Sequence, residues 1–245
     1  MRVYRIAERN IGIESLHEQV HALCSDYLTD GIPDFTVHID QKDIDQEKEL
    51  SAREDRLEGR LVRTWNEEYL EELAVYRKIA EIMPCYDTIL FHGSAVAVDG
   101  EGYLFSAESG TGKSTHAQLW RELLGSRFTY VNDDKPLIRI APEKILVFGT
   151  PYDGKHHRSA NISAPLKAIC FLKRGERNTI REIGTRDAFP LLMQQVYYPQ
   201  GKESLKKTIA LLNQLLEQVK FYQLFCNKNQ EAAHIAFEGM GGTLK

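Results

Sequence analysis

The sequence has little of what several common classes of protein need. Its 245 residues hold four cysteines, Cys24, Cys85, Cys170 and Cys226, and no two of them form a Cys-x-x-Cys pair. Neither a zinc ribbon nor a redox dithiol therefore has a basis in the sequence. Scattered single cysteines suit a reducing compartment, and we expect a cytoplasmic protein.

Long apolar runs and basic tracts are also missing. No apolar run approaches the ~18 residues that a membrane span needs. Residues 1–10, MRVYRIAERN, carry charges where a secretory signal has its apolar core. The formal net charge is -4, which argues against sequence-independent binding of a nucleic-acid backbone. We therefore expect neither a membrane nor a nucleic acid as partner.

The composition is that of a globular protein, with 42% hydrophobic and 27% charged residues. Residues 1–87 differ in texture from the rest. Strand patterns at 2–7 and 34–39 flank a helical spacing over 13–28, and the densely charged stretch 40–60 predicts a solvated loop or an exposed helix. Thr64 and an acidic first turn predict a helix that follows. We expect a small α+β N-terminal region, and its packing on the core is left open.

From Thr88 onward the pattern becomes β-α-β. Residues 88–98 and 103–107 read as strands joined by the turn DGEG, and a helix is expected over about 113–124. Further strands continue to about residue 184, including a hairpin made by LKAICFLKR and NTIREI. Helices follow, with a short strand FYQLF between them and a last helix near 229–238. The prediction is an α/β domain over 88–245, with a mixed sheet flanked by helices and its central strands between about 88 and 184.

The stretch Ala107 to Ser114 reads AESGTGKS, which fits the pattern of a small residue, four free positions and Gly-Lys-Ser. Glycines let backbone N–H groups turn inward around a phosphate, and a helix that begins near Lys113 adds its positive end there. The lysine supplies a charge for the β- and γ-phosphates and Ser114 a hydroxyl for Mg²⁺. The expected phosphate-binding residues are Ser109, Gly110, Thr111, Gly112, Lys113, Ser114 and Thr115.

A metal-holding acid is expected at the end of a neighbouring strand. The stretch FTYVNDD ends an apolar strand in Asp133 and Asp134. One carboxylate can hold Mg²⁺ with Ser114, while the other, turned the opposite way by strand alternation, accepts a proton from an acceptor hydroxyl. The alternative is a solvent-facing turn, because Asn, Asp and Pro are turn formers.

Together, HGSAVAV, YLFSAESGTGKSTHAQLW and VNDDKPLIR resemble the catalytic core of the HPr kinase/phosphorylase family, over roughly residues 88–184. The resemblance implies a P-loop fold shared with phosphoenolpyruvate carboxykinases. It places the family's His-Gly on His92 and Gly93, and its acidic pair on Asp133 and Asp134. In the family one aspartate acts as base toward a serine hydroxyl, with the histidine close to it. We favour Asp134 as the base and Asp133 as the metal-side acid.

One part of the chain departs from the family. The arginine-led second signature is absent, and residues 149–169, GTPYDGKHHRSANISAPLKAI, stand in its place. The reverse phosphorylase reaction and recognition of HPr are therefore left open. Within this stretch, Lys155 or Arg158 is expected to stabilise charge on the transferring phosphoryl group; the alternative is a mobile basic loop.

The sequence thus predicts a Walker A-type, nucleotide-binding transferase: a kinase that uses ATP and Mg²⁺ to phosphorylate a serine-type hydroxyl of a peptide, protein or small molecule. Two alternatives remain, a non-catalytic nucleotide-binding regulatory module and a carboxykinase-like lyase. The loop pattern reads phosphates and leaves ATP, GTP and pyrophosphate open as donors. The acceptor and the oligomeric state, a homo-oligomer included, are open as well.

Overall fold

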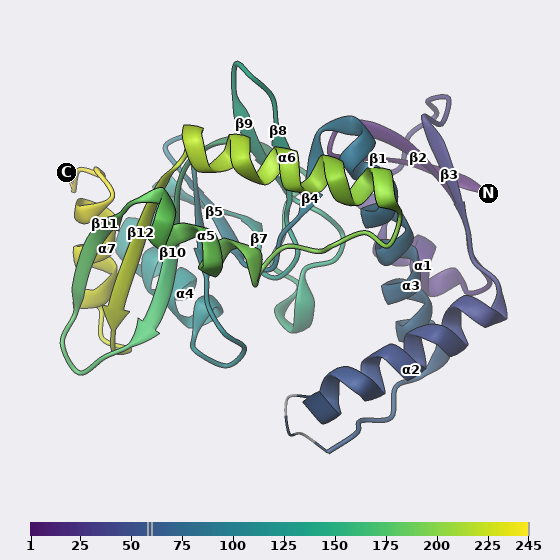
Figure 1. Cartoon of the computed structure of the whole chain (residues 1–245), viewed down its shortest axis with the longest axis horizontal. Coiled ribbons are helices and arrows are strands. Elements are labelled where there is room, and N and C mark those ends of the chain that lie inside the picture. Colours follow the sequence, from purple (N-terminus) through teal and green to yellow (C-terminus); the bar gives the residue numbers. More distant parts are fainter. Residues whose placement is uncertain (58, 60, 245) are drawn as a thin grey trace. The chain divides into compact units, whose positions relative to one another are not determined.

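The computed structural model describes residues 1–57, 59 and 61–244. The chain divides into two compact units, Met1–Ile82 and Met83–Lys245 (Figure 1). The boundary lies a few residues before the expected one, because the turn Met83–Tyr86 (η2) packs against β4 and α6 of the second unit. No helix in the described part of the chain combines the length and apolar character that crossing a membrane requires.

The N-terminal unit joins a small sheet to three helices. Strand β2 pairs antiparallel with β1 and parallel with β3. The elements are β1 (Arg2–Ile6), β2 (Arg9–Glu14), α1 (Glu18–Leu23), η1 (Ser25–Tyr27), β3 (Phe35–His38), α2 (Gln41–Leu57) and α3 (Glu67–Ile82).

The helix expected over 13–28 is wrong in its first part. Ala7 and Glu8 adopt positive φ values of 47° and 58°, which close a tight hairpin and bring Arg9 opposite Ile6. Pairing with β1 then extends residues 9–14, so that Ile13 belongs to β2 and only Glu18–Leu23 form the helix.

The charged stretch 40–60 forms helix α2 as far as Leu57, and its remaining part includes Glu58 and Arg60, which lie outside the described residues. The helix is not wholly solvated, since Glu47 is buried and accepts two hydrogen bonds from Arg77 of α3 at 2.7 and 2.8 Å. Asn66, rather than Thr64, caps α3: its side-chain oxygen accepts from the Tyr69 N–H at 3.0 Å.

The C-terminal unit is a mixed α/β domain. One path of strands runs β7-β5-β6-β10-β12-β11, and β4-β8-β9 joins it through the first residues of β10. The strands are β4 (Thr88–Leu90), β5 (Ser94–Val98), β6 (Glu101–Ser106), β7 (Phe128–Asn132), β8 (Leu137–Ile140), β9 (Ile145–Phe148), β10 (Ser163–Arg174), β11 (Thr179–Ile183) and β12 (Lys220–Cys226). The helices are α4 (Lys113–Leu124), η3 (Gly125–Arg127), η4 (Gly154–His156), α5 (Thr185–Met193), α6 (Lys202–Gln218) and α7 (Glu231–Gly239).

The expected hairpin between β10 and β11 is wrong. Strand β12 lies between them, parallel to β10 and antiparallel to β11. The insertion satisfies the backbone groups of β10 on that side with a strand from beyond residue 184, so the central sheet also extends past its expected end. Apolar residues of β12 alternate between the two faces of the sheet and pack into the core on both. A hairpin of β10 and β11 alone would leave these residues without neighbours.

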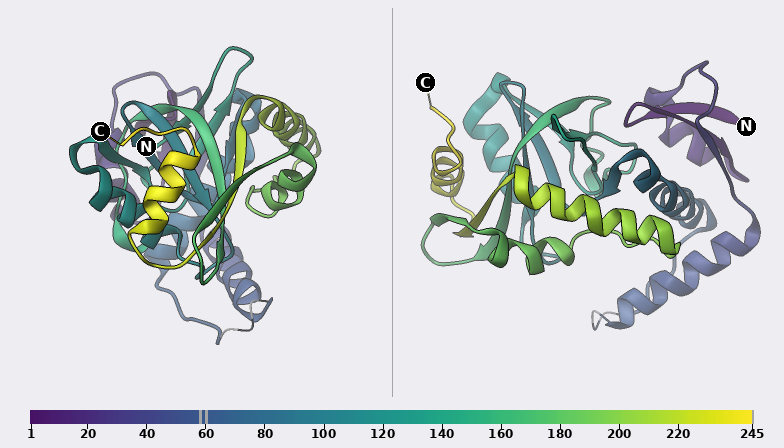
Figure 2. Two further views of the ribbon diagram at one scale, coloured as in Figure 1. Left: turned by 90° about the vertical axis from the view of Figure 1, so that its left-hand side faces the viewer. Right: turned by 45° about the horizontal axis from the view of Figure 1, so that its top comes forward.

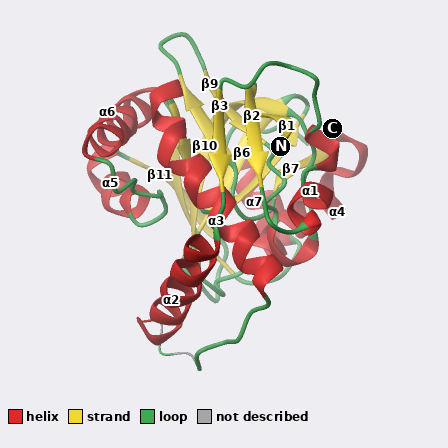
Figure 3. Cartoon of the chain, turned by 90° about the vertical axis from the view of Figure 1, so that its right-hand side faces the viewer, coloured by secondary structure: helices red, strands yellow, loops and turns green. Residues whose placement is uncertain are grey.

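Helices cover both faces of the sheet (Figures 2 and 3). Leu104 and Phe171 face α5 and α6, whereas the alternate residues Phe105 and Cys170 face α4 and α7. Trp120 of α4 is fully buried on the second face. This packing fixes the position of α4, and hence of the glycine-rich loop before it.

The strand directions bring distant parts of the chain to one edge. Strand β5 is antiparallel to both β6 and β7, so β6 and β7 run in the same direction. The ends of these two strands and the start of β5 therefore share an edge of the sheet. This edge carries the loop after Ser106, the acidic pair after Asn132, and His92, which comes shortly before Ser94.

Candidate functional site

The glycine-rich loop connects the end of β6 to the start of α4. Gly110 and Gly112 have φ values of 75° and 121°, in the region that L side chains rarely adopt. Helix α4 begins directly after Gly112 with no side-chain cap. The N–H groups of its first turn therefore present an uncapped positive end to the loop, which is the geometry that binds anions.

Lys113 lies across this loop. Its ammonium donates to the carbonyl oxygen of Ala107 at 3.2 Å. Burial lowers the pKa of Lys113, and the carboxylates of Asp134 and Asp133 oppose that shift. The lysine is thus within electrostatic reach of both acids.

Asp133 is the most enclosed acid of the site, with 5% of its surface exposed. Its Oδ1 accepts a hydrogen bond from the Ser94 hydroxyl at 2.6 Å, whereas its Oδ2 is buried with no hydrogen-bond partner. Burial raises the pKa of Asp133, and the hydroxyls of Ser94 and Ser114 counteract part of this. A bound cation would supply the partner that this buried carboxylate oxygen lacks, and the Ser114 hydroxyl would be its second oxygen ligand.

The donor set fits Mg²⁺ held together with a substrate. Among the described residues, no group of three His, Cys, Asp or Glu side chains could hold a metal ion by itself. Mg²⁺ normally takes one or two protein oxygens and completes its shell with phosphate oxygens and water. Asp133 and Ser114 supply such a pair, next to the loop.

Asp134 is more exposed than Asp133 and keeps 30% of its side-chain surface in contact with solvent. Its N–H donates to the Asn132 side-chain oxygen at 2.9 Å, and its backbone oxygen accepts from Gly93 at 3.0 Å. The carboxylate lies 3.6 Å from Nε2 of His92 and 4.0 Å from Nζ of Lys135. The two neighbouring acids therefore differ in exposure and in partners. The cause is the turn after β7 rather than the expected strand alternation, because β7 ends at Asn132.

His92 is held by its backbone, whose N–H donates to Gln195 at 2.8 Å. Burial, with the nearby Lys113 as the next cause, lowers the pKa of His92 to about 4. The ring is 42% exposed at the surface, and solvent there moderates the shift. The lowered pKa of His92 favours the uncharged ring beside Asp134.

Asn132 is a site residue that sequence reasoning missed. The residue is fully buried. Its side-chain NH₂ donates to Oγ1 and to the carbonyl oxygen of Thr150 at 2.9 and 3.1 Å. Its side-chain oxygen accepts hydrogen bonds from the backbone N–H groups of Asp134 and Lys135. It thereby fixes the turn that carries the acidic pair. The signal was present in the sequence, since asparagine readily forms such side-chain turns.

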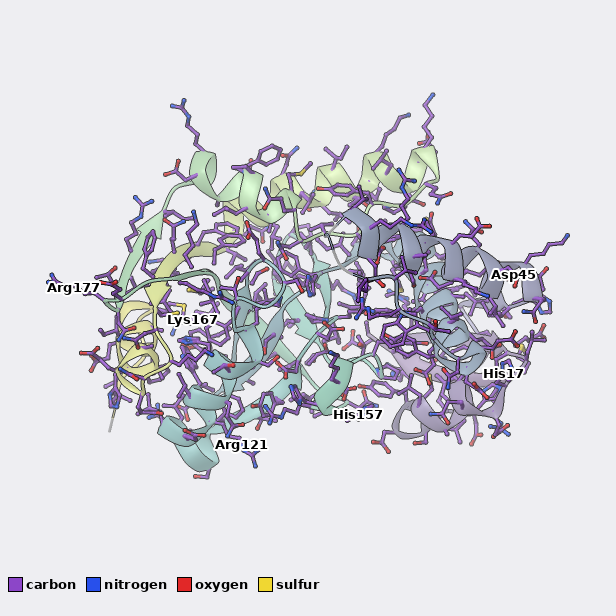
Figure 4. The ribbon with its side chains drawn as sticks, turned by 90° about the horizontal axis from the view of Figure 1, so that it is seen from below. His17, Asp45, Arg121, His157, Lys167 and Arg177 are labelled. Carbon is purple, nitrogen blue, oxygen red and sulfur yellow. The ribbon has the colours of Figure 1, made fainter. Side chains whose placement is uncertain are left out.

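The basic stretch after Gly149 brings Arg158 and His156 within electrostatic reach of Asp133, where both oppose the rise that burial causes in the pKa of Asp133. Arg158 donates to the Tyr130 hydroxyl at 3.2 Å and stacks over that ring at 5.3 Å. Lys155 lies exposed on η4 and makes no hydrogen bond or ion pair within the described part of the chain. Figure 4 labels His157 of this stretch and Arg121 of α4, which lie along the same edge in that view.

The likeness of this chain to known proteins is one of structure and is distant. No family model matches the chain. No curated protein matches it either. A solved structure that resembles it is the HPr(Ser) kinase/phosphatase from Coxiella burnetii, aligned over 60% of this chain and 90% of that chain with 10% identity and a TM-score of 0.33. At that TM-score the likeness carries no argument about function.

Proposed function

We propose that the Met83–Lys245 unit is a kinase that transfers the γ-phosphoryl group of ATP to a serine-type hydroxyl. The supporting observation is the buried, unpartnered Oδ2 of Asp133 at the edge that also carries the uncapped start of α4 and Lys113. Phosphoryl transfer depends on positioning and charge neutralisation, and these groups supply both.

The two acids have separate roles in this proposal. Asp133 and Ser114 hold Mg²⁺, which when bound neutralises charge on the β- and γ-phosphates. Asp134, the more exposed acid, accepts the proton of the acceptor hydroxyl. The hydroxyl oxygen attacks the γ-phosphorus at the same time, and the bond between the γ-phosphoryl group and ADP breaks. Neutral His92 lies beside Asp134 and orients the carboxylate or the hydroxyl without competing for the proton.

A cation from the basic stretch completes the proposed site. Arg158 is better supported than Lys155, because Arg158 already lies within electrostatic reach of Asp133 while Lys155 is exposed. In this role the guanidinium stabilises negative charge on the phosphoryl group during transfer.

Titration calorimetry with ATP and ADP, with and without Mg²⁺, tests the proposal. We expect Mg²⁺-dependent binding that Lys113→Ala weakens at least ~30-fold, because a desolvated phosphate loses its opposite charge. Lys144→Ala, an exposed lysine between β8 and β9, is the matched control and should bind as the wild type does. Absence of ATP binding by the wild-type protein would overturn the kinase assignment.

The position of Asp134 depends on Gly154, which leads to a second test. Gly154 has a φ of 73°, and a Cβ there would lie 3.0 Å from Cβ of Asp134. Gly154→Ala should therefore displace the carboxylate and lower the transfer rate roughly tenfold or more, with ATP affinity retained. Gly100→Ala has a similar φ of 85° and nothing within 4 Å, so it should cost stability alone. Equal transfer rates for the two variants would contradict the placement of Asp134 in the reaction.

A further inference from the structure

Residues 149–160 form a loop whose two ends meet beside strand β7. The N–H of Ala160 donates to the carbonyl oxygen of Val131 at 3.2 Å, and Ser159 pairs with Asn132 in an isolated antiparallel bridge. A Cβ on Gly149 would lie 1.8 Å from the carbonyl oxygen of Ala160, so only glycine fits at the point where the ends meet. Both ends of the 149–160 loop are therefore fixed to each other and to the strand that leads to the acidic pair.

Asp153 is the one acid of this loop, which is otherwise basic over residues 155–158. It is 7% exposed. Its Oδ2 accepts a hydrogen bond from the Ser159 hydroxyl at 2.9 Å, and its Oδ1 lies 3.3 Å from Nδ1 of His157. These two partners come directly after and directly before Arg158 in the chain. One carboxylate therefore restrains the loop on both sides of the arginine.

Two features of the loop are costly in the folded state. Burial raises the pKa of Asp153, and the Ser159 hydroxyl and His157 oppose this rise, so ionising the carboxylate inside the loop costs free energy. His157 has φ 46° and ψ 52°, a left-handed conformation that is uncommon outside glycine. Residues held in such conformations persist where the surrounding contacts enforce them, and they cluster at functional sites.

The residue that these restraints place is Arg158. Its guanidinium donates to the Tyr130 hydroxyl at 3.2 Å and lies within electrostatic reach of Asp133. The side chain is long and flexible, so where its charge stands depends on the backbone from which it extends. A displacement of about 1 Å at a reacting group can cost on the order of 10²-fold in rate.

We propose that Asp153 is a positioning residue for the phosphoryl transfer: it fixes residues 157–159 so that the guanidinium of Arg158 stands at the phosphoryl group. The inference rests on the proposed function and adds to it a residue that contacts neither the nucleotide nor the metal. The buried acid and the left-handed His157 then have the same role, which is to hold Arg158 in place.

A double-mutant cycle between Asp153 and Arg158 tests the inference. The readouts are the rate of transfer from [γ-³²P]ATP at saturating nucleotide and the affinity for Mg²⁺-ATP by titration calorimetry. Asp153→Ala should lower the rate roughly tenfold or more and change the affinity less than about twofold, because the arginine acts on the transition state. In the Arg158→Ala protein the same substitution should have no further effect on the rate. A role separate from Arg158 would instead lower the rate by the same factor in both proteins.

Two further variants complete the experiment. Asp153→Asn keeps the size of the side chain and one acceptor oxygen, so it should fold as the wild type does and lower the rate less than Asp153→Ala. It should also have no effect in the Arg158→Ala protein. Glu143→Ala removes an exposed acid between β8 and β9 of the same unit and is the matched control. Its rate should equal that of the wild type.

The outcomes separate the inference from the proposed function. Wild-type rates in both Asp153 variants, or in Arg158→Ala, would overturn the positioning role and leave the kinase assignment standing. Equal losses of rate with and without Arg158 would do the same, as would a loss of ATP affinity that matches the loss of rate. Absence of ATP binding and transfer in the wild-type protein would overturn the proposed function and the inference together.

Discussion

Asp134→Asn should lower phosphoryl transfer from ATP by about 10²–10⁴-fold, the usual contribution of a general base, while ATP affinity changes only a few fold. The amide has the size of the carboxylate, and the backbone groups of residue 134 still bond to Asn132 and Gly93. What it lacks is the ability to take the hydroxyl proton. The measurement is release of labelled phosphate from [γ-³²P]ATP to water and to a pool of serine-containing peptides.

The matched control for Asp134 is its neighbour in the turn. Lys135→Gln removes the ammonium that lies 4.0 Å from the Asp134 carboxylate and leaves the carboxylate in place, so transfer should persist with a modest change in rate. If Asp134→Asn retained full transfer and Asp133→Asn lost it with ATP still bound, the base would be Asp133 and the roles of the two acids would be reversed.

The sequence predicted the parts of this site that depend on local structure. The strand before the loop and the helix after it are confirmed, because these elements are continuous in the chain. Phosphate binding by the glycines, Lys113 and Ser114 stays a prediction. The convergence of the loop with Asp133 and Asp134 was expected from an apolar strand that ends in two acids. The structure provides the physical reason, since β5 is antiparallel to both β6 and β7 and aligns their ends.

Features that depend on distant pairing were beyond the reach of the sequence. Strand β12 enters between β10 and β11 from more than 30 residues away, and nothing in NTIREI indicates that its partner is not β10. The structure confirms the predicted mixed α/β class. The finer phosphoenolpyruvate carboxykinase-like assignment stays a prediction.

Asp133→Asn should stabilise the protein in the absence of ligand. Burial raises the pKa of Asp133, which means that the folded state disfavours the ionised carboxylate. That cost is absent below the unfolded pKa of 3.8, grows as the pH rises from there to the raised folded pKa, and is fully present above it. Asparagine retains an oxygen for Ser94 and carries no charge. We expect a higher melting temperature at pH 7, by about 2–4 °C for each kcal/mol relieved, and a gain that shrinks as the pH falls toward 3.8.

The same substitution should abolish the Mg²⁺ dependence of ATP binding and lower transfer by about 10³-fold or more, an effect of the size seen when transition-state charge loses its partner. Scanning calorimetry with and without Mg²⁺-ATP measures both effects: the ligand should raise the melting temperature of the wild type more than that of the variant. A variant that melts lower without ligand would show that the Asp133 charge is already compensated in the folded protein. In the expected result, the unpartnered Oδ2 costs stability until a cation binds it, as is common for groups whose partner arrives with the substrate.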